Sequence, residues 1–338
     1  MFTTRALRIV ERILLVAGLI LLGFLIRELG AASVVDNLRL VGWGIVPIIM
    51  QELVSYTANT AGWLAAFPRP RPAIPFTHLM AARMSGDAVN YVTPTATLGG
   101  EFVRTRFLRG QAAGTSLVAS VAVAKLSQTI GQIAFVVLGL GIILDETPLP
   151  DAIRYGLLAG LGALSAGAII LLFVQRRGMF APAFRLAQRW GLPARAPELM
   201  RRLQRLDAEI ARVHMSGDGA VVLSATCFFG GWCMGVVEIY LILWFLDVPV
   251  SVHRALTVEV LSVAIDGMLF FVPFKAGTQE GGKVLIFTLL GLDPAKGLAV
   301  GILRRIRELT WAVIGLLLLS RQQLAARPEL EPAKPLAR

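Results

Sequence analysis

The chain has 338 residues, of which 56% are hydrophobic and 16% are charged, and its mean hydropathy is +0.69. A water-soluble domain carries about 25% charged residues, so this composition excludes an ordinary soluble protein and predicts an integral membrane protein. The formal net charge of +11 does not indicate nucleic-acid binding, because basic loops beside apolar spans account for such an excess.

Six stretches of about 20 apolar residues predict membrane-crossing helices and hence an all-α membrane fold. They are 7–26, 43–66, 115–143, 154–174, 219–246 and 297–319. The first follows a basic start and lacks a small-residue cleavage site behind it, so we expect an uncleaved helix rather than a signal peptide.

Two further apolar regions, near 76–110 and 255–291, are interrupted in the middle by proline and glycine. The interrupting residues are Pro94, Gly99 and Gly100 in the first and Pro273 and Gly277 in the second. Proline removes a backbone donor and glycine loosens the backbone, so each region is expected to break into two half-helices. Broken backbone at membrane depth must be covered by protein or water, and each region is therefore interpreted as a re-entrant hairpin.

The segment 176–214 is rich in arginine and is expected to face the cytoplasm by the positive-inside rule. Six crossings then place both termini in the cytoplasm. One side of this segment is apolar at helical spacing. This pattern predicts either a helix lying on anionic lipid headgroups or a helix packed on the bundle.

The two interrupted regions align without a gap at one constant offset. The aligned pairs are Asp87 with Asp266, Pro94 with Pro273, Glu101 with Glu280, Arg104 with Lys283, Lys125 with Arg304, and Gln128 with Arg307. The first unit begins with the second crossing and the second unit with the fifth, so they enter from opposite sides. The pattern predicts an inverted-topology repeat, which many transporters use to build a site at the bilayer midplane.

These elements predict five parts along the chain. They are a first transmembrane helix with its outer connection (1–40), the first repeat (41–175), the basic cytoplasmic segment (176–214), the second repeat (215–320) and a disordered cytoplasmic tail (321–338).

Charge gathers around the two interruptions. Each second half-helix starts near a glutamate, and its free N–H groups and positive dipole end favour an anion. The expected substrate-binding residues are Glu101, Arg104, Lys125, Gln128, Glu280, Lys283, Arg304 and Arg307. The residues expected to couple movement to an ion or proton are Asp87, Asp266 and Glu308.

Two interpretations compete for these charges. In the functional one, cations outnumber the nearby glutamates and bind a lipid phosphate. In the structural one, the charges form internal salt bridges, and the expected pairs are Glu101 with Lys125, Glu280 with Arg304, and Arg304 with Glu308. Glu52 and Glu238 are isolated acids within predicted spans. Each is expected either to line a cavity or carry a proton, or to pair with Arg83 or cap a distorted turn.

Other chemistry is not indicated by the sequence. Cys227 and Cys233 lie in one apolar stretch and the three histidines are scattered, which gives neither a disulfide framework nor a metal-ligand set. We find no nucleotide-binding motif and no catalytic constellation, so we expect no cofactor, no metal and no enzymatic activity. Movement of a substrate would be downhill or coupled to an ion gradient.

Three segments resemble a known family. They are 94–109 (PTATLGGEFVRTRFLR), 273–292 (PFKAGTQEGGKVLIFTLLGL) and 303–311 (LRRIRELTW). They are similar to the signature regions of the lysylphosphatidylglycerol synthase transmembrane-domain family, also called flippase-like. The versions QEGG and RRIREL are most similar to its hopanoid-associated branch.

The resemblance covers about 7–320 and implies two re-entrant hairpins and movement of an amphiphilic lipid between leaflets. The namesake proteins continue into a soluble aminoacyl-transfer domain, which this chain is expected to lack. Phe274 and Lys275 depart from the common glycine-rich second motif, so the resemblance does not imply an identical substrate.

The sequence therefore predicts a lipid translocase, a flippase or scramblase, in a bacterial inner membrane. Its substrate would be an anionic phospholipid, isoprenoid or hopanoid-type lipid, and its cytoplasmic face would contact anionic headgroups. Two alternatives stay open: a secondary transporter of a small organic anion, and a non-transporting membrane subunit of a lipid-synthesis complex.

Overall fold

The computed structural model describes residues 20, 23–29, 31–92, 98–143, 151–189, 197–215, 219–268 and 277–325. In these residues helices form almost all of the regular structure, and one isolated bridge joins Arg109 and Ala112. The all-helical prediction is confirmed for this part of the chain. Most of the first predicted crossing, both interrupting prolines Pro94 and Pro273, and the end of the tail lie outside the described residues.

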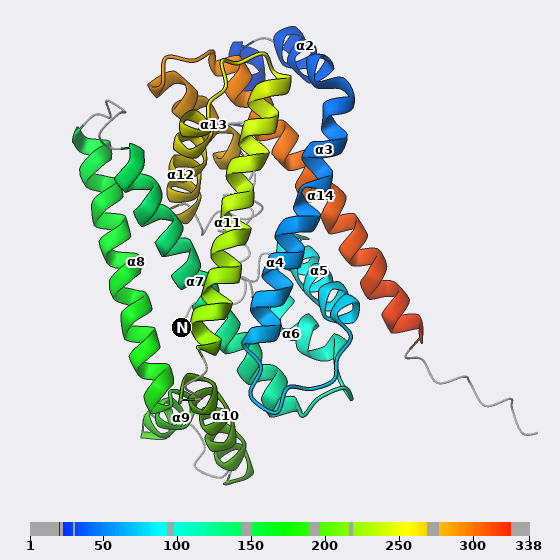
Figure 1. Cartoon of the computed structure of the whole chain (residues 1–338), viewed down its shortest axis with the longest axis vertical. Coiled ribbons are helices and arrows are strands. Elements are labelled where there is room, and N and C mark those ends of the chain that lie inside the picture. The colour runs from blue at the N-terminus through cyan, green and yellow to red at the C-terminus, as the bar shows by residue number, and fades with distance from the viewer. Residues whose placement is uncertain are drawn as a thin grey trace, which may run out of the picture.

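Figure 1 shows the helices as one bundle, with the long ones running along its length. In chain order they are α2 (Ala31–Val41), the short 3-10 helix η1 (Gly42–Gly44), α3 (Ile45–Met50), α4 (Glu52–Ala65), α5 (Phe76–Val92), α6 (Leu98–Phe107), α7 (Gly114–Ile143), α8 (Asp151–Arg177), α9 (Phe180–Arg189), α10 (Pro197–Met215), α11 (Ala220–Phe245), α12 (Val252–Met268), α13 (Thr278–Leu289) and α14 (Pro294–Ala325).

Among the described residues, 4 helical stretches are long and apolar enough to cross a membrane. They are Val35–Ala65, Gly114–Ile143, Arg154–Arg177 and Ala220–Phe245, and they correspond to four of the predicted crossings. Helix α14 contains the predicted crossing 297–319 and has 32 residues, or about 48 Å of helix. Its length suffices to span, but four charged residues in its middle make its composition unlike that of a simple span.

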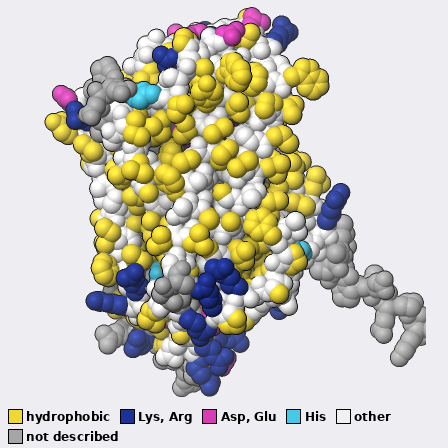
Figure 2. All heavy atoms as spheres, viewed as in Figure 1, with side chains coloured by type: hydrophobic (Ala, Val, Ile, Leu, Met, Phe, Trp, Pro, Cys, Tyr) yellow, Lys and Arg dark blue, Asp and Glu magenta, His cyan; other side chains and the backbone are white. Residues whose placement is uncertain are grey.

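The outer surface carries the charge distribution of a multi-pass membrane protein. Figure 2 shows hydrophobic side chains over the middle of the visible face, Lys and Arg gathered at its lower end, and Asp and Glu at its upper end. An apolar band between polar ends matches a bilayer core between two aqueous boundaries.

The two interrupted regions form pairs of shorter helices, as the proline and glycine positions predict. Helix α5 ends at Val92 and packs against α6, which begins at Leu98; α12 ends at Met268 and packs against α13, which begins at Thr278. In Figure 1 the first pair lies in the lower half of the bundle and the second in the upper half.

Close backbone contact explains Gly100 of the first pair. A Cβ atom at Gly100 would collide with the Gly86 carbonyl oxygen of α5 and with the Asn90 side chain. The Gly100 N–H donates to Asn90 Oδ1 at 2.7 Å, which satisfies one of the free donors at the start of α6. In the second pair, Gly277 precedes α13 with φ +71°, a conformation that favours glycine.

The basic segment forms α9 and α10 at the lower end of the bundle (Figure 1). The apolar side of α10 packs onto the bundle through Leu206, Ile210 and Val213, which are all buried. Asp207 of α10 accepts hydrogen bonds from the first backbone N–H groups of α9, at 2.9 to 3.0 Å. The apolar stripe therefore packs on the bundle, the second of the two predicted arrangements, and leaves the arginine side exposed.

His214 joins α10 to the end of α8. Its Nε2 lies 3.1 Å from Oε1 of Gln175 at the end of α8. Burial, and then the charge of Arg176, lower the pKa of His214 below its ordinary value of 6.5. The folded state then binds fewer protons than the unfolded state. The stability that neutral His214 contributes is therefore complete above the pKa of the unfolded state, and it is lost as the pH falls toward the lowered pKa of the folded state.

We expect acidification from about pH 7.5 to about pH 5.5 to increase hydrogen exchange of the α10 amides relative to the intrinsic exchange rate at each pH, since an ordinary histidine titrates between these values. His214→Gln should remove most of this increase. An equal increase in the wild type and in the variant would contradict the assignment.

Candidate functional site

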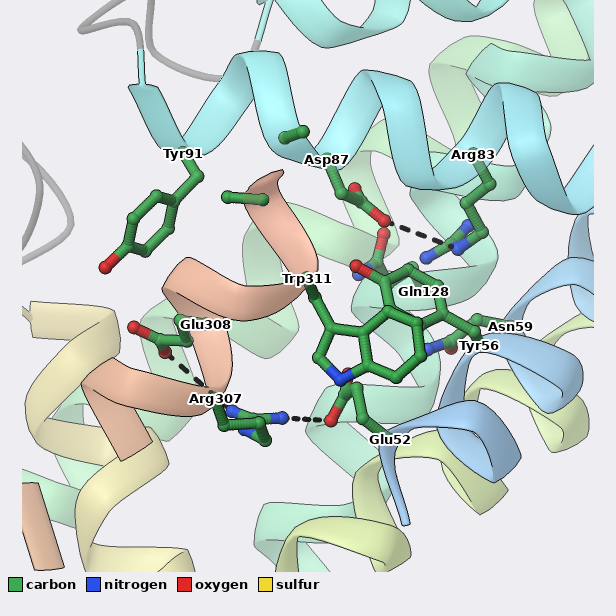
Figure 3. A pocket seen from close by; sticks show the side chains of 12 residues that line it. Glu52, Tyr56, Asn59, Arg83, Asp87, Tyr91, Gln128, Arg307, Glu308 and Trp311 are labelled. Atoms are coloured by element: carbon green, nitrogen blue, oxygen red, sulfur yellow. Dashed lines mark hydrogen bonds and ion pairs between the residues drawn. The ribbon is translucent and has the colours of Figure 1, made fainter. Parts of the chain in front are cut away.

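A cavity of about 390 Å³ lies between α4, α5, α7 and α14. We call it the polar cavity. Its polar walls are formed by Glu52, Asn59, Arg83, Asp87, Gln128, Arg307 and Glu308, and its aromatic walls by Tyr56, Tyr91 and Trp311. Figure 3 shows Arg83 and Asp87 reaching toward it from α5 on one side, and Glu52 and Arg307 meeting on the other.

The first charged cluster joins the hairpin α5–α6 to α7. Arg104 is buried and bonds Asp87 of α5 and, at 2.8 Å, Glu101 one turn before it in α6. Lys125 of α7 lies 3.7 Å from Glu101, so this predicted pair is confirmed. Arg83 also lies 3.7 Å from Asp87.

The cations of this cluster differ in the exposure of their side chains. The Arg104 side chain is 8% exposed, whereas the Lys125 side chain is 46% exposed although it lies near the middle of a 30-residue apolar helix. A charge at that depth is costly unless it meets a partner or water. Lys125 is therefore the cation of this cluster that an external ligand reaches most easily.

The second cluster fastens α14 to α4, α11 and α12. Arg304 donates to Glu238 of α11 at 3.1 Å and pairs with Glu259 of α12. Arg307 pairs with the same Glu238 at 2.8 Å and with Glu52 of α4. Two guanidinium groups and three carboxylates thus lie together, with Glu238 bridging the arginines.

Two of the predicted pairs are wrong. Glu280 pairs with Arg305 at 2.7 Å, and Arg305 also donates to the Tyr91 hydroxyl at 3.2 Å. Glu308 lies 3.9 Å from Arg307 instead of pairing with Arg304. The reason is geometric: successive residues of a helix point about 100° apart, so neighbouring arginines meet different helices.

The expected excess of cations is present in the first cluster, where Arg83, Arg104 and Lys125 meet two carboxylates, and absent from the second, where three carboxylates meet two arginines. Every cation of the two clusters lies within ion-pair distance of a carboxylate, because Glu52, Glu238 and Glu259 join the glutamates of the repeat. The expected pairing of Glu52 or Glu238 with Arg83 is not found among the described contacts. An anionic ligand must therefore exchange with a carboxylate, and Lys125, the most exposed cation of the two clusters, lies 3.7 Å from its partner Glu101.

The remaining predicted residues have different positions. Gln128 lines the polar cavity one turn from Lys125, as the helical spacing predicts. Lys283 is buried in α13 and Asp266 is half-buried in α12, and neither lines the cavity. Gly99 is half-buried beside Gly100 at the start of α6. Glu259 is a partner that the sequence interpretation missed, because it lies in a predicted hairpin with no counterpart acid in the first repeat.

Metal chemistry finds no support in the part of the chain that the structure describes, where His, Cys, Asp and Glu form no group of three or more fit to hold a metal ion. Cys227 and Cys233 are free, half-buried thiols on α11. The site therefore consists of ion pairs, amides and aromatic rings around a cavity.

Comparison with known proteins agrees with this membrane architecture. Residues 9–316 match the family model described as "Lysylphosphatidylglycerol synthase TM region". A "UPF0104 membrane protein" of Methanothermobacter thermautotrophicus is 21% identical over 309 residues, which cover 87% of this chain and 90% of that protein. No solved structure matches the chain. Because the family model covers nearly its whole length, the chain belongs to the lysylphosphatidylglycerol synthase transmembrane-region family.

Proposed function

We propose that the protein moves a membrane lipid between the two leaflets, and that the polar cavity carries the headgroup. The observation that supports this most is a charged cavity of about 390 Å³ in a bundle with an apolar outer surface. Each charge at the bilayer centre costs about 2.5–3.5 kcal/mol on insertion scales, so charged residues retained in the cavity wall favour a functional role. Membership of a family named for a lipid synthase's membrane region supports a lipid as the substrate.

In this proposal the hairpins α5–α6 and α12–α13 are re-entrant and belong to an inverted repeat formed by 41–175 and 215–320. Their places in opposite halves of the bundle support that assignment (Figure 1). The arginine-rich lower end is the cytoplasmic one by the positive-inside rule, in a bacterial inner membrane with both termini inside. There the exposed arginines of α10 contact anionic lipid headgroups.

The headgroup step is an exchange of ionic partners. A lipid phosphate entering the cavity contacts Gln128 on its wall and reaches Lys125, which lies one turn away on α7 outside the lining, where it displaces Glu101. The acyl chains stay in the surrounding bilayer. Arg104 pairs with Glu101 at 2.8 Å and also pairs with Asp87. Glu101 therefore retains a partner when the phosphate displaces it from Lys125. Asp87 and Glu308 on the cavity wall, and Asp266 in the second hairpin, are the carboxylates that would couple this exchange to a proton.

A small organic anion is the second candidate substrate. The cavity volume falls within the range of about 300–1,000 Å³ that is usual for small-ligand sites, and its aromatic walls suit a planar anion. Such a transporter would respond to soluble anions and not to lipid headgroups.

The test is reconstitution into liposomes that contain a phosphatidylglycerol labelled with a dithionite-quenchable fluorophore. We expect the protein to increase the fraction of label that becomes accessible to external dithionite, relative to protein-free liposomes. Liposomes loaded with a panel of small organic anions provide the second arm. Anion release without any lipid movement would replace the lipid by the anion as substrate.

A further inference from the structure

A second hollow lies on another side of α7, between α7, α8 and α12. It has a volume of about 230 Å³ and its walls are mostly apolar. Its apolar side chains include Ile133 and Val136 of α7, Leu157 and Leu161 of α8, and Val263 of α12. We call it the apolar groove.

Glycines keep the apolar groove open. Gly156 and Gly160 of α8 and Gly267 of α12 line it, and a Cβ atom built at any of them meets no atom within 4 Å. Gly139 of α7 behaves in the opposite way, because a Cβ there would collide with Val260. Glycine between membrane helices usually lets them approach closely, so glycines that face open space indicate room for something else.

The surroundings of α8 identify the occupant as hydrocarbon. Only 11% of its most apolar stretch is buried inside the protein, against 44% for α7, so in a bilayer acyl chains would cover most of α8. Apolar cavities of about 150 Å³ stay dry in proteins and accept apolar guests. A larger apolar groove beside the bilayer therefore takes a lipid chain rather than water.

A polar edge connects the apolar groove to the polar cavity. Thr129 and Gln132 of α7 line the groove, and the adjacent Gln128 lines the cavity. From Lys125 to Gln132 the helix rises about 10 Å, at 1.5 Å per residue. The stretch of α7 from Lys125 to Gln132 thus has an exposed cation at one end and the apolar groove at the other. This arrangement is complementary to the polar head and apolar chain of an amphiphile.

We propose that the apolar groove binds one hydrocarbon chain of the lipid whose headgroup contacts α7 between Lys125 and Gln132. This inference rests on the proposed function and supplies the site of the lipid tail. Neighbouring residues of α7 then hold both ends of the same molecule. Filling the groove should weaken binding of the tail without touching any charged residue.

The probe is a phosphatidylglycerol with a photoactivatable diazirine in the middle of one chain, incorporated into liposomes with the full-length protein. Cross-linked peptides are mapped by mass spectrometry. In the wild type we expect labelling at groove residues of α7, α8 and α12. Gly160→Phe places a ring in the open space and should reduce that labelling about tenfold, the change in affinity that corresponds to ~1.4 kcal/mol.

Gly162→Phe is the matched control, since Gly162 is on the same helix, also faces open space and does not line the groove. It should leave groove labelling at the wild-type level. Gly160→Leu repeats the test with a smaller side chain, and thermal unfolding verifies that each variant is folded.

Equal groove labelling in wild type, Gly160→Phe, Gly160→Leu and Gly162→Phe would overturn the inference. The lipid-movement assay on the same samples separates it from the proposed function. Lipid movement without labelling of the groove would overturn tail binding in the groove and leave the proposed transport standing. Labelling of the wild-type groove that is lost in Gly160→Phe, with no lipid movement by the wild type, would support tail binding and contradict the proposed transport.

Discussion

Arg304→Met should lower the free energy of unfolding by about 3–5 kcal/mol, because it removes one partner of a buried ion pair. Arg304 links Glu238 of α11 to Glu259 of α12, and the side chains of these two glutamates are 1% and 4% exposed. Without the guanidinium group, Glu259 loses the ion pair that compensates its burial. Methionine keeps a similar length, so the loss is mainly electrostatic.

Unfolding in mixed detergent micelles, followed by circular dichroism, measures this effect. Arg202→Met is the matched control, because the Arg202–Glu198 pair of α10 is largely exposed and such pairs contribute about 0–1 kcal/mol. The double variant Arg304→Met/Glu259→Gln should recover part of the loss by removing the buried charge. Equal stability of Arg304→Met and Arg202→Met would contradict the role assigned to this pair.

Lys125→Gln should slow lipid movement about tenfold, which corresponds to ~1.4 kcal/mol in the barrier. Lys125 is half-exposed and its ion pair with Glu101 is long, so folding should change by less than about 1 kcal/mol. Lys125→Arg retains the cation and should retain most of the rate.

The control for this prediction is Arg106→Gln. Arg106 is exposed near the end of α6 and does not line the polar cavity. Its replacement should leave the rate of lipid movement unchanged. If Lys125→Gln moves lipid at the wild-type rate, headgroup binding at Lys125 is wrong.

The parts of the fold that are local in sequence were predictable. Runs of about 20 apolar residues predicted α7, α8 and α11 within a few residues of their ends, because hydropathy is the strongest signal in a membrane protein. The interruptions at Gly99–Gly100 and before Gly277 predicted where two helices begin, since glycine and proline disfavour helix interiors. One ion pair, Glu101 with Lys125, also followed from the aligned repeat.

The partners of the α14 arginines were not predictable from sequence. Arg304 meets acids 66 and 45 residues away, and Arg307 meets one 255 residues away. Which helix each guanidinium faces depends on the rotation of α14 in the bundle, which no local pattern specifies. The apolar groove could not be predicted for a related reason. The sequence does not distinguish a glycine that permits close helix packing from one, such as Gly160, that leaves open space between helices.

The most direct test of the polar cavity as the headgroup path uses a single cysteine at Gln128, in a chain with Cys227→Ser and Cys233→Ser. Reaction with a trimethylammonium thiosulfonate would place a bulky charged group in the cavity, while the same reaction at Arg106→Cys serves as control. We predict that modification of Gln128→Cys reduces lipid movement in liposomes to the level without protein, and that modification of Arg106→Cys does not. Complete modification of Gln128→Cys with an unchanged rate of lipid movement would contradict the account.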